Sequence, residues 1–499
     1  MIKRVLLFFG LFALTVLLYR NGLHIPYYND DYQRVFIHPK EAIFEGFLTA
    51  NQYDGFYRPI EQLVLATIQF EWGWDTFPVR LLHFLIHAAI ALLVFHILRA
   101  WKVPPGCALA ASVFIIVSQL SVYAVASNNS MSQMLATLFS ALSLWLLYRS
   151  FIAQGSKDKR WNYIFSVVFF FAALLSKETS TGLLLAIPLL LIVQKDEYHN
   201  IRIRLRVIAG KCIPYGICFI GYLLLRKNAG ASVPVFSGPI TTYSMMFGDN
   251  IIRNAQYFAI QMALPLSTVS VMKDVFFREY ASLVSIGIFT GIFTLLLAYG
   301  VWKSSKRWIG LFLCALIIIS WFPTIFLTHL MELYAYNMVV YIALLIGIST
   351  EYYWQKLSKQ FPLLLAVCCT FFVVVLIANA FGVNEKTSLM QSEALRAEIF
   401  LPQLIGITHT APENTTVYLI NSPDTFKYSK FISTTFGVSE HSEDLLRFYA
   451  KRPDVSFFIE DSAHCVRHMQ EYPGITFTCN RQSLRIYPIE PNIMEELKK

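Results

Sequence analysis

Long runs of apolar residues recur from the start of the chain to about residue 382. A helix needs about 20 mostly apolar residues to cross a bilayer, within a range of about 17–25. The chain is therefore predicted to be a polytopic α-helical membrane protein. We expect about eleven spans, at residues 3–20, 80–99, 106–126, 131–150, 161–176, 180–194, 208–226, 281–302, 308–328, 335–350 and 361–382.

The first run resembles a signal peptide, because Lys3 and Arg4 precede its apolar core. The residues that follow it, Tyr19-Arg20-Asn21-Gly22, contain no small-residue cleavage site of the A-x-A kind. We therefore expect the first span to remain as an uncleaved helix.

The pattern changes after residue 382, where polar and apolar positions mix as in soluble domains. Residues Thr416–Ile420 and Ser456–Ile459 read as strands, and Glu440–Tyr449 reads as a helix. We expect a membrane domain over 1–382 and a small α/β soluble domain over 383–499. Within the membrane domain, two large loops, 21–79 and 227–280, are predicted on the outer face.

Composition supports this class. Of 499 residues, 56% are hydrophobic and only 15% are charged, whereas soluble domains carry about 25% charged residues. The net charge of +9 divides unevenly. Residues 383–499 hold 12 basic and 15 acidic residues (net −3), which leaves 29 basic and 17 acidic residues (net +12) in the membrane part. The basic excess is thus a topology signal and gives no support to nucleic-acid binding.

Lysine and arginine set the expected orientation. With the N-terminus inside, the basic clusters that follow alternate spans fall on the inner face, as the positive-inside rule requires. The later basic clusters stay on the inner face only if residues 251–271 do not cross the membrane. Arg253 and Asn254 also interrupt the apolar run there. We therefore expect 251–271 to be a re-entrant or interfacial helix, with the C-terminal domain outside.

An acidic pair, Asp30 and Asp31, follows the first span directly. A carboxylate at the outer rim is placed to accept a proton from a substrate hydroxyl. The pair is also compatible with a divalent metal, which would need further oxygen ligands, or with a solvated turn in which an Asx side chain caps the backbone. We assign no metal ligands and expect no cofactor to be required, and a divalent metal stays an open alternative.

Two cations are expected at the same rim. Arg58 lies in the segment Tyr57-Arg58-Pro59-Ile60, and Lys177 lies in Ser176-Lys177-Glu178. A permanent guanidinium cation suits phosphate, and charges at the membrane edge are costly unless they are useful. Interfacial anchoring of Tyr57 and Arg58, and a local ion pair between Lys177 and Glu178, are the structural alternatives.

Glu332 and Tyr334 lie between two later spans, again at the outer rim, where an aromatic belt is the simpler explanation for tyrosines. Arg80, His83 and His87 lie on one face of the second span, at i, i+3 and i+7. This stripe is expected to face protein or a cavity, where it either contacts substrate or joins helices by hydrogen bonds. Together, these groups favour a site for a lipid-linked phosphate substrate.

In this order, the motifs resemble those of the GT-C fold glycosyltransferases that use polyprenyl-phosphate sugars. The resemblance covers roughly residues 1–382. It is strongest to the membrane half of the transmembrane and tetratricopeptide-repeat O-mannosyltransferases and their bacterial relatives. It implies that Asp30 or Asp31 is the base, with Asp30 favoured. It also implies that Arg58 and Lys177 hold the donor phosphate.

The remaining motifs match less completely. Tyr57, Arg80, His83, His87, Glu178, Glu332 and Tyr334 take supporting or substrate-binding places. Where relatives carry Arg-x-Asp, this chain has Met131-Ser132-Gln133, and the Glu-Arg-Tyr motif lacks its arginine in Glu332-Leu333-Tyr334. Three explanations stay open: a substitute cation (Arg226, Lys227 or Arg253), a different donor headgroup, or an altered activity.

The resemblance implies an inverting transfer of a sugar from a polyprenyl-phosphate donor to a hydroxyl of an extracytoplasmic acceptor, such as a glycan, lipid or protein. Three other classes stay open: a lipid-linked-glycan flippase or transporter, a polysaccharide polymerase or ligase, and a catalytically silent scaffold. We expect the protein in the bacterial inner membrane with a cytoplasmic N-terminus and a periplasmic C-terminal domain. Cys465 and Cys479 in that domain are either free or paired in a disulfide.

Overall fold

The structure is a computed structural model that describes residues 2–27, 31, 34–36, 38–50, 55–193, 201–231, 245–263, 267–269, 271, 274, 278–322, 324–327, 331–410, 416–420, 454 and 456–460. The chain divides into two compact units. The first comprises Met1–Leu23 and Phe36–Thr387, and the second comprises His24–Val35 and Ser388–Lys499.

The first unit is a bundle of helices. These are α1 (Ile2–Leu18), α2 (Pro39–Glu45), α3 (Pro59–Trp72), α4 (Phe77–Ala100), α5 (Pro105–Val117), α6 (Val122–Ala126), α7 (Met131–Ile152), α8 (Ser156–Ser176), α9 (Leu183–Val193), α10 (Ile201–Asn228), α11 (Asp249–Ala263), α13 (Tyr280–Lys303), α14 (Arg307–Trp321), α15 (Tyr336–Gln360) and the first part of α16 (Pro362–Thr410). Short 3₁₀ turns connect them: η1 (Arg20–Gly22), η3 (Gln119–Ser121), η4 (Asn128–Ser130), η5 (Glu178–Gly182) and η6 (Glu332–Ala335).

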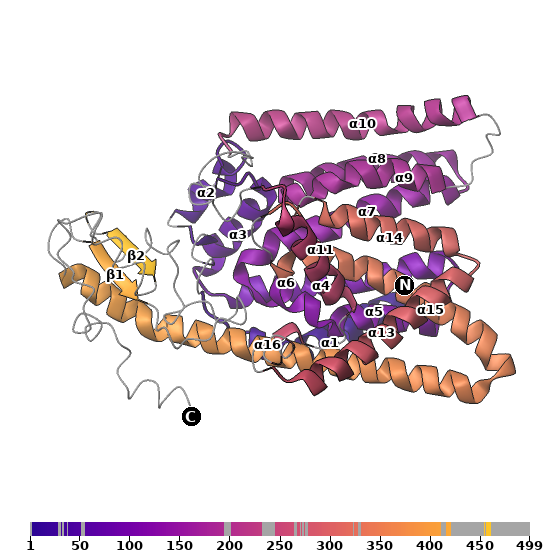
Figure 1. Cartoon of the computed structure of the whole chain (residues 1–499). Coiled ribbons are helices and arrows are strands. Elements are labelled where there is room, and N and C mark those ends of the chain that lie inside the picture. The colour runs from indigo at the N-terminus through magenta and orange to yellow at the C-terminus, as the bar shows by residue number, and fades with distance from the viewer. Residues whose placement is uncertain are drawn as a thin grey trace. The chain divides into compact units, whose positions relative to one another are not determined.

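Figure 1 shows α7, α8, α9 and α10 side by side, with α2 and α3 at one end of them. We call this end of the bundle the loop end. The turns η5 and η6 lie there too, since α8 ends and α15 begins at that end. The turns from α4 to α5, α13 to α14 and α15 to α16 lie at the opposite end.

Each of the eleven predicted apolar runs falls on a helix or, for residues 106–126, on the broken pair α5 and α6. Among the described residues, six helices are long and apolar enough to cross a membrane, and a bent pair makes a possible seventh. The six lie within 77–100, 128–152, 205–228, 280–303, 332–360 and 362–392, and the bent pair covers 105–126 with a bend of 48°. The protein is thus an integral membrane protein, and eleven crossings stay a prediction.

Burial separates central from peripheral spans. In α15, 89% of the most apolar window is buried inside the protein, compared with 6% in α13 and 11% in α16. A helix that is apolar all round and buried by protein is a core element. The apolar outer faces of α13 and α16 are what a lipid-facing helix needs. The central helix α15 thereby fixes the position of η6 at its start.

The run at 251–271 is described as α11, with 15 residues from Asp249 to Ala263. At 1.5 Å per residue this helix is about 22 Å long, which is shorter than the roughly 30 Å hydrocarbon core. Asn254 on α11 is buried and donates to the carbonyl oxygens of Ile325 (2.9 Å) and Leu327 (2.8 Å). Asn254, one of the polar residues that interrupt this run, therefore binds the chain that follows α14, and the re-entrant or interfacial placement of 251–271 stays a prediction.

The second unit contains the two predicted strands. They are β1 (Thr416–Ile420) and β2 (Ser456–Glu460), which pair in parallel with Thr416 opposite Ser456. The predicted helix at 440–449 and both cysteines, Cys465 and Cys479, lie outside the described residues.

The structure draws the boundary between units differently from the sequence pattern. Helix α16 runs unbroken from Pro362 to Thr410, so the expected division at 382/383 falls inside a helix, and the compact units divide at 387/388. The apolar content falls near residue 383, but helical spacing of buried positions continues through Asn379, Val383 and Lys386. The predicted loop 21–79 is also divided, because His24–Val35 belongs to the second unit.

Candidate functional site

The two predicted phosphate-binding cations meet at the loop end. Pro59 occupies the first turn of α3 and sets its start, which places Arg58 at the N-cap. The Arg58 guanidinium donates to both carboxylate oxygens of Glu178, with Nη2–Oε1 at 2.6 Å and Nε–Oε2 at 3.0 Å. The Phe56 ring lies under the same guanidinium, 4.1 Å from its centroid. This planar two-point contact is the geometry by which arginine also binds phosphate.

Lys177 lies directly beside this pair. It adopts an extended conformation between α8 and η5, and its side chain is buried. Its ammonium lies 5.5 Å from the centroid of the Tyr334 ring in η6, which is a cation–π contact. Three motifs spread over more than 270 residues of the sequence therefore converge: the Arg58 segment, the Lys177 segment and the Tyr334 segment.

Glu178 is ionised in this setting. Burial alone would raise the pKa of its carboxyl, but the guanidinium of Arg58 and the ammonium of Lys177 lower the pKa to about 2. The carboxylate side chain keeps 30% of its surface exposed, whereas that of Arg58 keeps 9%. Glu178 is thus the more accessible partner, and the anion that neutralises the two cations faces the surface of the bundle.

A buried acid that the motif search missed lies behind Arg58. Glu61, one turn along α3, has a carboxylate oxygen 4.0 Å from Nη1 of Arg58. The same carboxyl accepts a hydrogen bond of 3.1 Å from the backbone N–H of Ser132, at the N-terminus of α7. An acid is favoured at a helix N-terminus. This is the place where relatives carry Arg-x-Asp, so α3 supplies an acid to the helix start that lacks one of its own.

A second missed residue is Lys386 of α16. Its side chain is fully buried, and Nζ donates to both carboxylate oxygens of Glu332 at 2.8 Å and to the Gln119 carbonyl at 3.3 Å. The Thr268 hydroxyl also donates to Glu332. Glu332, whose motif lacks its arginine, therefore obtains a cation from another helix. The helical spacing of polar and apolar positions through residue 386 is the signal that could have identified it.

The stripe on α4 lies inside the protein, as expected. Arg80, His83 and His87 all have fully buried side chains. The Nδ1 atom of His87 lies 2.7 Å from the hydroxyl of Tyr336, and the His87 ring packs against Tyr19. His87 therefore joins α4 to the central helix α15 and to the end of α1. This contact is the helix-joining role that was the alternative to substrate contact.

Tyr57 and Arg226 link the site to α10. The Tyr57 side chain is fully buried, its hydroxyl donates to the Phe47 carbonyl (3.3 Å), and its ring lies 6.3 Å from that of Tyr222. Arg226, a predicted substitute cation, donates from Nη1 to the Tyr222 hydroxyl at 3.2 Å. Tyr57 is thus a packing residue behind Arg58, and Arg226 lies at the edge of the same end of the bundle.

The acidic pair is described in part. Asp30 lies outside the described residues. Asp31 belongs to the second compact unit, and its side chain is 2% exposed. No group of three or more metal-binding side chains occurs among the residues that the structure describes.

Chemically, the cluster of Arg58, Lys177, Glu178 and Tyr334 can hold an anion. Two buried cations share one accessible carboxylate, so an incoming anion can replace that carboxylate on the guanidinium without leaving either cation unpaired. Burial strengthens such electrostatic contacts relative to water. The charged groups of the cluster neutralise one another, so the cluster is suited to binding and charge stabilisation.

Comparison with solved structures shows a likeness in fold to ArnT. A crystal structure of ArnT from Cupriavidus metallidurans bound to undecaprenyl phosphate aligns with a TM-score of 0.55 and 12% identity over 96% of each chain. ArnT from Cupriavidus metallidurans in the apo state aligns with a TM-score of 0.53 and 13% identity, over 91% of this chain and 85% of that one. No protein-family model and no curated protein sequence matches.

Proposed function

We propose that this chain, which has the GT-C glycosyltransferase fold of ArnT, is an integral-membrane glycosyltransferase that takes a sugar from a polyprenyl-phosphate donor. One observation carries the proposal: Arg58 and Lys177 converge, buried, at one end of a bundle whose fold matches a protein bound to undecaprenyl phosphate. The acceptor is a hydroxyl of an extracytoplasmic glycan, lipid or protein.

The donor phosphate binds where the Glu178 carboxylate lies. A phosphate monoanion or dianion offers the guanidinium the same pair of oxygens that Glu178 offers now. Glu178 then moves aside into the solvent that it already contacts, and Lys177 neutralises the second charge. During transfer the phosphate becomes the leaving group, and the two cations stabilise the charge that develops on it. A separate general acid is therefore not required.

The acceptor hydroxyl is activated by the acidic pair. Asp30, with Asp31 positioning the acceptor, removes the hydroxyl proton as the oxygen attacks the anomeric carbon from the face opposite the phosphate. A single displacement inverts the configuration of that carbon. No metal takes part in this scheme.

The membrane arrangement follows the charge pattern. Eleven spans place the loop end on the outer face of a bacterial inner membrane, with the N-terminus in the cytoplasm. The second unit is then a periplasmic α/β domain. The parallel pairing of β1 and β2 supports that class, because parallel strands need a crossover connection.

The proposal is tested with purified protein, a radiolabelled polyprenyl-phosphate sugar and isolated envelope as acceptor. Removing one charge-stabilising donor costs roughly 10²–10³ in rate, and we expect that loss for Arg58→Ala and for Lys177→Ala. Arg58→Lys keeps the positive charge but cannot make the two-point contact, so it should recover only part of the rate that Arg58→Ala loses. Lys40→Ala, an exposed cation on α2 at the same end, is the matched control. Full transfer by both alanine variants would contradict the donor site.

The acid is tested in the same assay. Asp30→Asn and Asp31→Asn should each lower transfer while leaving the binding of undecaprenyl phosphate unchanged, since neither touches the phosphate in this scheme. If both variants keep full transfer, the assigned base is wrong. Accumulation of an intact lipid-linked precursor in cells without the gene, with no loss of a single sugar, would favour a flippase or a ligase.

A further inference from the structure

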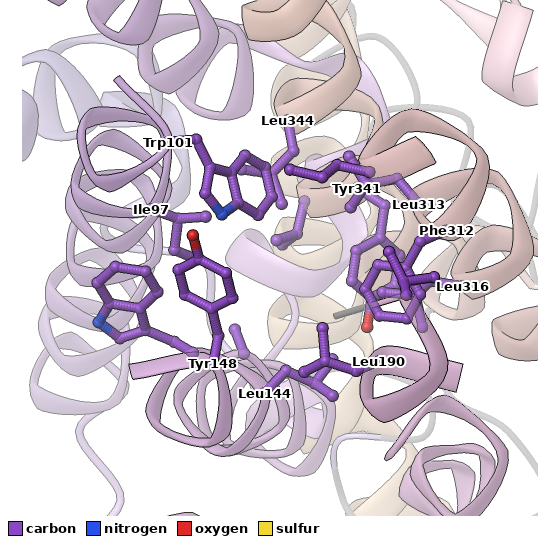
Figure 2. Close-up of a pocket in the computed structure, with 15 residues that line it drawn as sticks. Ile97, Trp101, Leu144, Tyr148, Leu190, Phe312, Leu313, Leu316, Tyr341 and Leu344 are labelled. Atoms are coloured by element: carbon purple, nitrogen blue, oxygen red, sulfur yellow. The ribbon is translucent and has the colours of Figure 1, made fainter. Parts of the chain in front are cut away.

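A large cavity lies at the end of the bundle opposite the candidate site. Its volume is about 580 Å³, which falls within the roughly 300–1,000 Å³ of ligand pockets. Its walls come from the start of α5, the second halves of α13 and α15, and the start of α16. A cavity of about 50 Å³ between α4, α7, α9, α14 and α15 (Figure 2) has Trp101 and Tyr148 in its wall, and its volume lies far below the range of ligand pockets.

The walls of the large cavity suit an alkyl chain. They are mostly aliphatic and aromatic, and their polar side chains are used within the protein. Ser349 and Tyr353 donate to the Leu296 carbonyl at 3.4 and 2.8 Å, and Thr350 donates to the Ile346 carbonyl at 2.8 Å. The cysteines in the wall behave as small apolar groups. These wall groups thus leave little for a polar solute to bind. A chain of methylene groups makes no hydrogen bonds, so it gives up none on entering the cavity.

Basic residues gather at the end of the bundle where the cavity lies. The end of α4 with the segment after it, the α13–α14 turn with the helix ends beside it, and the last part of α15 hold seven basic residues and one acid: Arg99, Lys102, Lys303, Lys306, Arg307, Lys356, Lys359 and Glu351. The single acid is neutralised, because Lys306 lies 2.5 Å from it. Lys102 lies two residues before the wall residue Pro104, and Lys356 lies two residues after the wall residue Trp354. Both lysines are exposed.

We propose that this cavity binds an anionic phospholipid, with one acyl chain between α5, α13, α15 and α16 and the phosphate against Lys102 and Lys356. Apolar space between spans of a membrane protein is open to acyl chains, and basic pockets between transmembrane helices bind anionic headgroups. The site is separate from the candidate donor site and does not depend on the proposed reaction. A bound lipid would fill the gap between the peripheral helices α13 and α16 and the central helix α15.

The cavity can be filled without disturbing its walls. Gly106 lines it, and a Cβ added there meets no atom within 4 Å. Gly106→Leu therefore places a side chain in the space assigned to the acyl chain. Gly287→Leu is the matched control, because that glycine also has open space around a Cβ and does not line the cavity.

The experiment is native mass spectrometry of the delipidated full-length protein with added phosphatidylglycerol or phosphatidylethanolamine. We expect phosphatidylglycerol to bind more tightly, Gly106→Leu to abolish that preference and Gly287→Leu to keep it. Lys356→Gln should weaken phosphatidylglycerol binding by about fivefold, since a lysine near an anionic surface contributes about that much, and Lys40→Gln should not.

Equal binding of the two phospholipids would overturn the proposal, as would unchanged binding in both Gly106→Leu and Lys356→Gln. If undecaprenyl phosphate displaces phosphatidylglycerol and Gly106→Leu blocks its binding, the cavity takes the donor tail and the proposal is also overturned. Lys356→Gln keeps the test valid if the leucine variant does not fold.

Discussion

The ion pair between Lys386 and Glu332 is expected to contribute strongly to the stability of the first unit. The Lys386 side chain is fully buried and that of Glu332 is 8% exposed, and two bonds of 2.8 Å join them. Breaking a buried pair by removing one partner costs about 3–5 kcal/mol, because the other charge stays buried and uncompensated. Lys386→Met keeps most of the side-chain volume, so we expect a loss of this size in the free energy of unfolding.

The double variant Lys386→Met/Glu332→Leu separates the lost pair from the uncompensated charge. Replacing both partners of a buried pair by apolar groups is often neutral or stabilising by about 1–4 kcal/mol. The double variant should therefore be clearly more stable than Lys386→Met alone. The double variant should also lose far less free energy of unfolding than the two single variants lose together, because the effects of mutating two residues in contact are not additive.

The measurement is unfolding of the purified protein by titration of a denaturing detergent into mixed micelles, followed by tryptophan fluorescence. Lys306→Met is the matched control, because Lys306 pairs with buried Glu351 but keeps 15% of its own side chain exposed. The control should lose less stability than Lys386→Met. A loss below about 1 kcal/mol for Lys386→Met, or single losses that add fully in the double variant, would refute the reasoning.

Three further predictions follow from the same contacts. The folded pKa of Glu178 is about 2, below the ordinary 4.5. The stability that its ion pair contributes is therefore complete above pH 4.5 and is lost as the pH falls toward 2, and Glu178→Gln should remove that slope from unfolding measured across pH 2–5. Tyr336→Phe removes the 2.7 Å hydrogen bond to His87 and should cost roughly 0.5–1.5 kcal/mol in the detergent titration; an unchanged midpoint would contradict it. Gly300→Leu places a Cβ against Ser349, and this overpacking should cost about 1–3 kcal/mol, whereas Gly287→Leu should cost nothing measurable.

The sequence pattern predicted the helical elements well, because apolar runs and their breaks are local properties. It also predicted that Arg80, His83 and His87 face protein, since three polar residues on one helix face have few other places to go in a membrane. The strand bounds in the second unit followed from short apolar runs in the same way. What these cases share is that the deciding information lies within one or two turns of the chain.

The sequence pattern did not predict which side chains of the site pair with one another. Motif order placed Arg58 and Lys177 at one rim, but it did not show that Glu178 forms a two-point ion pair with Arg58, which lies 120 residues away in the sequence. Lys386 was missed because it lies 54 residues from Glu332 and just beyond the point where the apolar content falls. Such pairs form between separate helices, so they depend on packing that no local pattern encodes.

The second unit is formed by two segments that lie far apart in the sequence, and this has a consequence for biosynthesis. The segment that contains Asp31 belongs to one compact unit with residues 388–499, and 352 residues, 36 to 387, separate the two along the chain. A ribosome that adds about 5–20 residues per second needs about 20–70 s to cover that distance. A nascent chain therefore holds its candidate acid long before it holds the rest of that unit. The last part of the chain to leave the ribosome is what completes the surroundings of one of the first residues to be made.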